Sequence, residues 1–175
     1  YLGESNLWPS RCANFGVLDL CGFPKDQYYN YQSLWTDEPM VHMLPHWTHP
    51  GKEGVEIPVV VYTNCDNVEL LLNGKSLGTQ KYADEQLVWH VPYRPGIIEA
   101  VARDTEGNTV ATDRNRTAGK PEAVAVRLDR DSASANRTDV VHVEVEIVDE
   151  NGTPCPMADN EVTFEIEGPA RLIGV

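Results

Sequence analysis

Three histidines at short spacing are the side chains of this sequence with the clearest potential for metal binding. His42, His46 and His49 would share one face of a helix, and imidazole is a common zinc ligand. Pro45 and Pro50 interrupt the segment, and a proline inside a helix costs about 3 kcal/mol. We therefore predict that this segment forms a packing corner and that it binds no metal.

Two acidic positions could be mistaken for catalytic carboxylates. Asp19 precedes a turn at residues 22–24, and Asp26 begins a helical pattern directly after Lys25. Negative charge in the first turn of a helix is favourable because the amino end carries a partial positive charge. We expect Asp19 and the pair Lys25-Asp26 to cap and orient this helix, and we assign no catalytic residue to the chain.

Three aromatic residues could stack on a sugar, but a core position is more typical of them. Trp47, Trp89 and Tyr93 lie among strand-like segments, where a buried tryptophan is the commoner role. The sequence has no glycine-rich nucleotide loop and no Gly-x-Ser-x-Gly motif, so it gives no support for nucleotide binding or serine hydrolysis.

The four cysteines carry little information about function. None of Cys12, Cys21, Cys65 and Cys155 belongs to a Cys-x-x-Cys pair, which excludes a zinc ribbon or a dithiol redox motif. We expect free and mostly buried thiols, with a Cys12–Cys21 bridge left open.

One helix is predicted near the start of the chain, over residues 25–36. Tyr28, Tyr31, Leu34 and Trp35 recur at helical spacing and form one apolar face. Pro39 prevents the helix from continuing beyond residue 38.

The remainder of the chain has the pattern of β-sandwich domains. Residues 39–118 contain strand patterns at 57–62, 68–72, 75–78, 87–91, 97–102 and 109–112, and Asn73-Gly74 is a strong hairpin signal. Residues 119–175 contain strand patterns at 123–128, 140–147 and 162–166, too few for an immunoglobulin-like sandwich of about seven strands. The predicted domains are an immunoglobulin-like sandwich at 39–118 and the first part of a second, truncated one at 119–175.

The charge balance excludes one class of partner. The formal net charge is −13, and an acidic surface repels the phosphates of nucleic acids. The longest apolar runs have the length of a strand, so we expect no membrane span.

Several motifs together resemble glycoside hydrolase family 2, in its bacterial β-galactosidase branch. Residues 1–5 (Tyr-Leu-Gly-Glu-Ser), 15–19 (Phe-Gly-Val-Leu-Asp) and 22–26 (Gly-Phe-Pro-Lys-Asp) are similar to the end of the catalytic barrel in that family. Residues 69–78 (Glu-Leu-Leu-Leu-Asn-Gly-Lys-Ser-Leu-Gly) are similar to the sandwich that follows the barrel, and residues 148–175 to the first half of a later sandwich.

The resemblance implies a fold and a reaction. Residues 1–38 would be the last strand, loop and helix of a (β/α)8 barrel, followed by the two sandwich domains. Members of the family are retaining glycosidases with two catalytic glutamates, both of which would lie upstream of this chain. The resemblance thus implies a C-terminal fragment that is inactive alone and that needs no cofactor and no metal.

The same resemblance places the loop after the last barrel strand at the rim of the sugar pocket. Active sites of such barrels lie at the carboxyl ends of the strands. The candidate substrate-binding residues are therefore Glu4, Ser5, Asn6, Trp8, Arg11 and Phe15. Loop packing with a buried ion pair is the alternative interpretation of this segment.

The resemblance thus implies part of an exo-β-glycosidase, a β-galactosidase that removes terminal β-linked galactose from oligo- or polysaccharides. The alternative is a carbohydrate-binding or structural sandwich module without catalysis of its own. A carbohydrate is the expected partner, contacts in a homo-oligomer through the sandwiches are left open, and a periplasmic or secreted bacterial location is expected.

Overall fold

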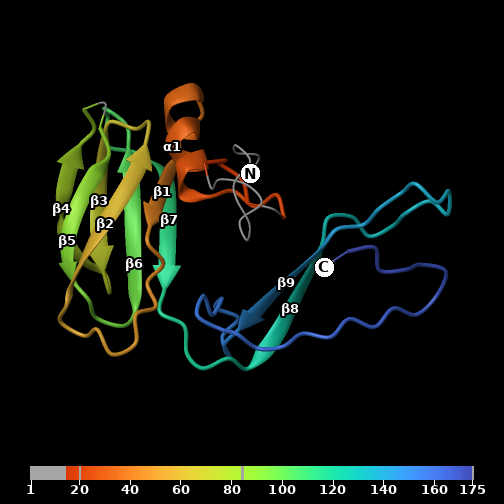
Figure 1. The fold of residues 1–175 in the computed structure, drawn as a ribbon. Helices are drawn as coiled ribbons and strands as arrows, with labels where there is room; N and C mark the ends of the chain where they lie inside the picture. The colour runs from red at the N-terminus through yellow and green to blue at the C-terminus, as the bar shows by residue number, and fades with distance from the viewer. Residues whose placement is uncertain (1–14, 20, 84, 175) are drawn as a thin grey trace. The chain divides into compact units, whose positions relative to one another are not determined.

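The computed structural model describes residues 15–19, 21–83 and 85–174. In this part the protein is mainly β with antiparallel sheets, which confirms the predicted fold class. The chain divides into two compact units, the first ending at Thr117 and the second beginning at Ala118 (Figure 1). Among the described residues, no helix is long and apolar enough to cross a membrane.

The first unit consists of one helix and two antiparallel sheets. The sheets have the strand orders β1-β2-β5 and β4-β3-β6-β7. The elements are α1 Asp26–Trp35, β1 Val41–Leu44, β2 Glu56–Thr63, β3 Asn67–Leu72, β4 Lys75–Lys81, β5 Leu87–Pro92, β6 Ile97–Arg103 and β7 Thr109–Arg116. The predicted strands are present, several of them longer than expected, whereas β1 was not predicted.

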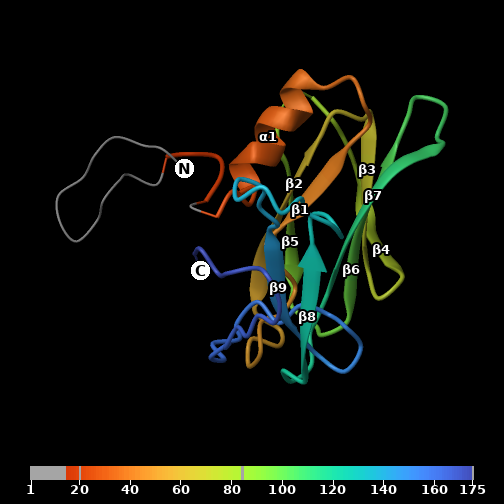
Figure 2. The same cartoon turned by 90° about the vertical axis from the view of Figure 1, so that its right-hand side faces the viewer.

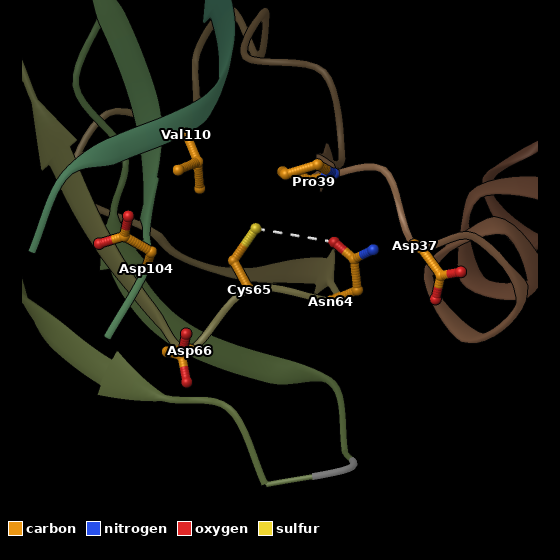
Figure 3. A pocket seen from close by; sticks show the side chains of 7 residues that line it. All are labelled: Asp37, Pro39, Asn64, Cys65, Asp66, Asp104 and Val110. Atoms are coloured by element: carbon orange, nitrogen blue, oxygen red, sulfur yellow. Dashed lines mark hydrogen bonds between the residues drawn. The ribbon is translucent and has the colours of Figure 1, made fainter. Parts of the chain in front are cut away.

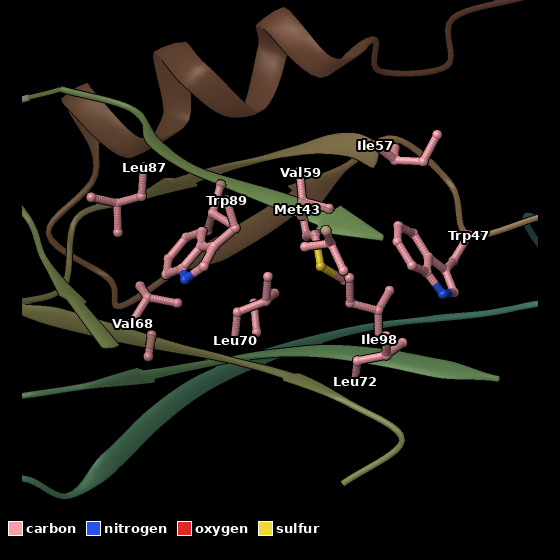
Figure 4. Close-up of a cluster of buried hydrophobic side chains, with 14 of the residues drawn as sticks. Met43, Trp47, Ile57, Val59, Val68, Leu70, Leu72, Leu87, Trp89 and Ile98 are labelled. Atoms are coloured by element: carbon pink, nitrogen blue, oxygen red, sulfur yellow. The ribbon is translucent and has the colours of Figure 1, made fainter. Parts of the chain in front are cut away.

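The core of this sandwich lies between the two sheets, as Figure 4 shows. In β3, Val68, Leu70 and Leu72 are buried while the intervening side chains are not, because successive side chains of a strand point to opposite faces. Val59 of β2 and Trp89 of β5 face them from the other sheet. Burial of this apolar surface is the main force that holds the sheets together.

Side chains close the two seams where the edges of the sheets meet. At the seam of β1 and β7, the Met43 amide donates to Oδ2 of Asp113 at 2.7 Å, and Nδ2 of Asn115 donates to the Met43 carbonyl at 3.4 Å. At the seam of β4 and β5, Nε2 of Gln80 donates to the Val88 carbonyl at 2.8 Å. Side chains thus form hydrogen bonds with backbone groups at both edges, although no continuous ladder of backbone hydrogen bonds joins the two sheets there.

The turn between β3 and β4 has the expected Asn-Gly conformation. Asn73 and Gly74 adopt φ values of 52° and 76°, the left-handed pair that a tight hairpin requires. The Asn73 carboxamide also reaches a neighbouring loop, where Nδ2 donates to the Pro95 carbonyl at 3.1 Å and Oδ1 accepts from the Ile97 amide at 2.8 Å. The hairpin is therefore fixed to the start of β6.

Helix α1 contacts β1 and β2 of the sandwich, and Figure 2 shows it beside these strands. Its inward side carries the buried Ser33, whereas the predicted apolar face is exposed to solvent. Tyr31 and Trp35 stack on each other on this outer face with ring centroids 5.2 Å apart, and 80% of Trp35 is exposed. The helical spacing was predicted correctly, but the face it defines does not contribute to the sandwich core.

The second unit contains one antiparallel pair, β8 Ala123–Leu128 and β9 Val143–Val148. The predicted strand at 162–166 is wrong for this structure, which has no strand there. A strand requires a neighbouring backbone, and among the described residues this segment has none in a ladder.

Asp149 organises the turn that follows β9. Its buried carboxylate accepts hydrogen bonds from the backbone amides of Gly119 at 2.8 Å, Asn151 at 2.9 Å and Thr153 at 2.9 Å. The amides of Gly119 and Thr153 are the main reason that the pKa of Asp149 lies below its usual value. The charged form of Asp149 thus ties residue 119 to this turn.

Candidate functional site

Most of the predicted sugar-binding residues lie outside the described part of the structure. This applies to Glu4, Ser5, Asn6, Trp8 and Arg11, whose predicted role stays a prediction. Phe15 is described, and 78% of it is exposed. Of the predicted rim, the structure therefore locates this one aromatic residue.

The segment that follows Phe15 is a short hairpin built around Asp19. The Asp19 carboxylate accepts from the amides of Cys21 at 2.8 Å and Phe23 at 2.9 Å, and Leu18 bridges to Pro24. A carboxylate that satisfies two backbone donors is held in place as a turn residue. Asp19 therefore has a structural role, but the expectation that it caps the helix is wrong, because the amides that it binds belong to its own turn and α1 has no side-chain cap hydrogen bond at its start.

His42 of β1 lies at the centre of a polar cluster between α1 and the sandwich. Its Nε2 is 3.0 Å from Oδ1 of Asp26 in the first turn of α1, and its Nδ1 is 3.9 Å from Oδ2 of Asp113 in β7. The Tyr29 ring stacks on the imidazole with centroids 3.7 Å apart. Burial, followed by the nearby charge of Asp26, raises the pKa of Tyr62 on the adjacent strand.

The sequence did not predict this cluster. Asp26 was correctly placed at the helix start, but its partner is 16 positions further along the chain and no local pattern links the two. The arrangement can hold α1 against the sandwich, since one imidazole contacts a carboxylate on the helix and faces another on β7. We call the four residues Asp26, Tyr29, His42 and Asp113 the helix clasp.

The segment around Trp47 forms a buried corner. Trp47 and Tyr93 are almost fully buried, and Nε1 of Trp47 donates to the Arg94 carbonyl at 3.0 Å. Trp89 also lies in the core. The predicted core role of these three aromatics is therefore confirmed, and none of them offers an exposed face to a sugar.

His46 and His49 stack on each other in the same corner. Their planes differ by only 24°, so the lone pairs, which lie in the ring planes, do not converge on one point. Burial, followed by the neighbouring His49 and Lys52, lowers the pKa of His46. Within the described residues, Nε2 of His49 is buried without a hydrogen-bond partner. Packing accounts for this pair better than metal ligation does.

A small hollow of about 140 Å³ opens at the end of the sandwich near the end of α1 (Figure 3). It is lined by Asp37, Pro39, Asn64, Cys65, Asp66, Asp104 and Val110. The Cys65 thiol lies 3.6 Å from Oδ1 of Asn64. Hydrogen bonds, chiefly from the Asn108 side chain, lower the pKa of Asp104. The Asp104 carboxylate thus stabilises the turn in which it lies. The described lining residues provide no paired acid and base for catalysis.

Comparison with known proteins matches both parts of the chain to families. Residues 54–111 match a domain family of unknown function, DUF4982, and residues 124–175 match glycoside hydrolase family 2 C-terminal domain 5. The whole chain is 42% identical to β-galactosidase BoGH2A of Bacteroides ovatus and 41% identical to a putative β-glucuronidase of Formosa agariphila. It spans 21% and 18% of the length of these two relatives.

Solved structures agree with this match. A β-glycosidase from Bacteroides vulgatus is 55% identical, with a TM-score of 0.91 over 97% of this chain and 22% of its own. A family 2 glycosyl hydrolase from Bacteroides cellulosilyticus is 38% identical, with a TM-score of 0.75 over 81% of this chain and 22% of its own. The chain therefore belongs to glycoside hydrolase family 2 and carries a C-terminal domain of that family.

Proposed function

We propose that this chain is part of a retaining exo-β-glycosidase, a β-galactosidase that hydrolyses terminal β-linked galactose in oligo- or polysaccharides. The observation that carries the proposal is the match of 42% identity over the whole chain to a β-galactosidase. A putative β-glucuronidase matches almost equally well, at 41%. The sugar is therefore the part of the proposal that most needs an experiment.

In this proposal, residues 1–38 end the catalytic barrel and the sandwich supports it. The exposed outer face of α1 favours this arrangement. Tyr28, Tyr31, Leu34 and Trp35 form an apolar stripe on the side away from the sandwich, and such a stripe in a soluble protein usually marks a packing surface. The chain spans 21% of the length of the β-galactosidase that it matches, so the rest of such a protein would be large enough to cover this stripe.

The two catalytic glutamates would come from that preceding domain. A retaining mechanism requires two carboxylates about 5–5.5 Å apart, one as nucleophile and one as acid and base. Glu4, Trp8 and Arg11 would then form part of the pocket wall, with Trp8 stacking on the sugar and the charged residues binding hydroxyl groups.

The test uses the full-length protein that contains this chain, assayed with matched aryl β-galactoside and aryl β-glucuronide substrates. We expect hydrolysis of the galactoside with kcat/KM at least about tenfold higher than for the glucuronide, a difference of 1.4 kcal/mol in transition-state binding. Proton NMR of the first product should show the β-anomer. Preference for the glucuronide would refute the galactosidase assignment, and an α-anomer would refute retention.

A second measurement concerns the chain alone. Purified residues 1–175 should release no aryl alcohol above the uncatalysed rate, because both catalytic carboxylates would be missing. Turnover by this chain would overturn the proposed location of the active site. Inactive full-length protein would instead refute the proposed reaction.

A further inference from the structure

The sequence contains two Asn-Gly pairs, Asn73-Gly74 and Asn151-Gly152, and both occupy turns. We propose that Asn151 is a site of spontaneous deamidation in the folded protein, whereas Asn73 is protected from the same reaction by its hydrogen bonds. Both pairs contain the same reacting groups, so a difference in their rates of deamidation must come from their surroundings.

The reaction uses the chain itself and water. The glycine nitrogen attacks Cγ of the preceding asparagine, because glycine has no Cβ to obstruct the approach. An N–Cγ bond forms, the Cγ–Nδ2 bond breaks, and the amide nitrogen leaves as ammonia with the proton lost by the glycine nitrogen. Water then opens the cyclic imide at either carbonyl, which yields aspartate or an isoaspartate whose backbone passes through the side chain.

The surroundings of Asn151 permit this attack. Asn151 and Gly152 are both exposed, and the Asn151 carboxamide forms no hydrogen bond with any described residue. A Cβ placed on Gly152 would meet nothing within 4 Å, and the same is true of Gly74, so crowding around the glycine does not distinguish the two sites. The Gly152 amide donates to the Asp149 carbonyl at 2.9 Å, and this turn hydrogen bond must open before the nitrogen attacks.

The surroundings of Asn73 oppose the attack. Both ends of its carboxamide are held, Nδ2 by the Pro95 carbonyl and Oδ1 by the Ile97 amide. Its own amide also donates to the Ile97 carbonyl at 2.8 Å. Rotation of Cγ towards Gly74 requires the loss of both side-chain bonds, so we expect reaction at Asn73 to be slower by about tenfold or more.

Reaction at Asn151 would alter a turn that holds part of the second unit together. Oδ1 of Asp149 accepts the amides of Asn151 and Thr153, and its Oδ2 accepts the amide of Gly119. An isoaspartate adds a backbone atom between these donors, and either product adds negative charge next to Asp149 and Glu150. The modified turn should therefore hold Gly119 less firmly.

The test compares the two sites in the same molecules. The purified chain is incubated in mildly alkaline buffer, digested, and analysed by liquid chromatography and mass spectrometry, with a parallel incubation in concentrated urea. In the native sample we expect conversion at Asn151 at least about tenfold faster than at Asn73. In urea the two rates should be similar, because neither turn is then formed.

Asn151→Gln provides the control, since its longer side chain forms the cyclic imide far more slowly. This variant should retain the native fold and show no early conversion at residue 151. Equal native rates at the two sites would overturn the proposal. Conversion at Asn151 that occurs only in urea would also overturn it, because the turn would then be protective.

Discussion

The carboxamide of Asn73 lies directly against the α-carbon of Gly96. A Cβ added to Gly96 would come within 1.8 Å of Oδ1 of Asn73, far closer than two such atoms can approach. Gly96 also adopts a φ of 136°, which L side chains rarely adopt. The hairpin after β3 and the loop before β6 thus fit together only because residue 96 has no side chain.

Gly96→Ala should therefore lower the free energy of unfolding by about 2–4 kcal/mol, because it strains the backbone and expels the Asn73 carboxamide from two hydrogen bonds. Urea unfolding followed by tryptophan fluorescence would measure the loss. Gly107→Ala is the matched control, since its φ is 86° but nothing lies within 4 Å of the added Cβ. It should cost only about 1–2 kcal/mol, and equal losses would contradict the steric argument.

Removal of the imidazole at the centre of the helix clasp should release α1 locally. His42→Ala loses the stacking on Tyr29 and the contact with Asp26, so we expect α1 to open more easily by about 1–2 kcal/mol. Hydrogen exchange would show faster exchange in α1 and unchanged exchange in β3 and β6.

The control for this prediction is His90→Ala. His90 pairs with Glu56, and both side chains are largely exposed, so its loss should leave α1 unchanged. Unchanged exchange of α1 in His42→Ala would show that the clasp does not hold the helix.

The second unit should lose stability in acid through Asp149. Its pKa is lowered in the folded state, so the stabilisation is fully present above the unfolded value of about 3.9 and is lost as pH falls through the folded value. The protection factor of the Gly119 amide, which corrects its exchange rate for the intrinsic rate at the same pH, should then fall as the pH drops below about 4.

Asp149→Asn should remove most of this pH dependence, because the carboxamide oxygen carries no titrating charge. The exposed Asp159 provides a control, and Asp159→Asn should retain the pH dependence of the parent chain. The same acid sensitivity in both variants would exclude Asp149 as its source.

Thr117 is the last residue of the first unit, and its hydroxyl joins three segments. It donates to the Trp47 carbonyl at 2.6 Å, accepts from the Gly96 amide at 3.1 Å and lies 3.4 Å from the Tyr93 hydroxyl. Thr117→Val keeps the shape but leaves these groups unpaired, so we expect a loss of about 1–3 kcal/mol in unfolding free energy. Thr112→Val, on the exposed side of β7, should change stability by less than about 0.5 kcal/mol.

Much of the sandwich could be predicted from the sequence because its signals are local. The alternation in β3 and the Asn73-Gly74 turn are patterns of a few residues with a direct structural meaning. Strand β1 was missed because it has only four residues and lies among histidines and prolines. Its ladder with β2 forms through contacts that no local pattern encodes.

The errors and omissions have the same physical origin. The helical spacing of the apolar residues in α1 was predictable, but the stripe that they form is directed away from the sandwich. The spacing alone does not show which part of a protein packs against that stripe. The alternation at 162–166 predicted a strand that lacks a neighbour in this structure. The pairing of His42 with Asp26 joins distant positions, so only the folded chain reveals it.

The seams of the sandwich have a consequence for association between molecules. An exposed sheet edge can add a strand from another chain, which is a common route to aggregation. Asp113 and Asn115 occupy backbone groups of β1, and Gln80 occupies a carbonyl of β5, so these positions have less capacity to pair with a foreign strand. Three polar side chains thereby help the sandwich to remain a separate folded body.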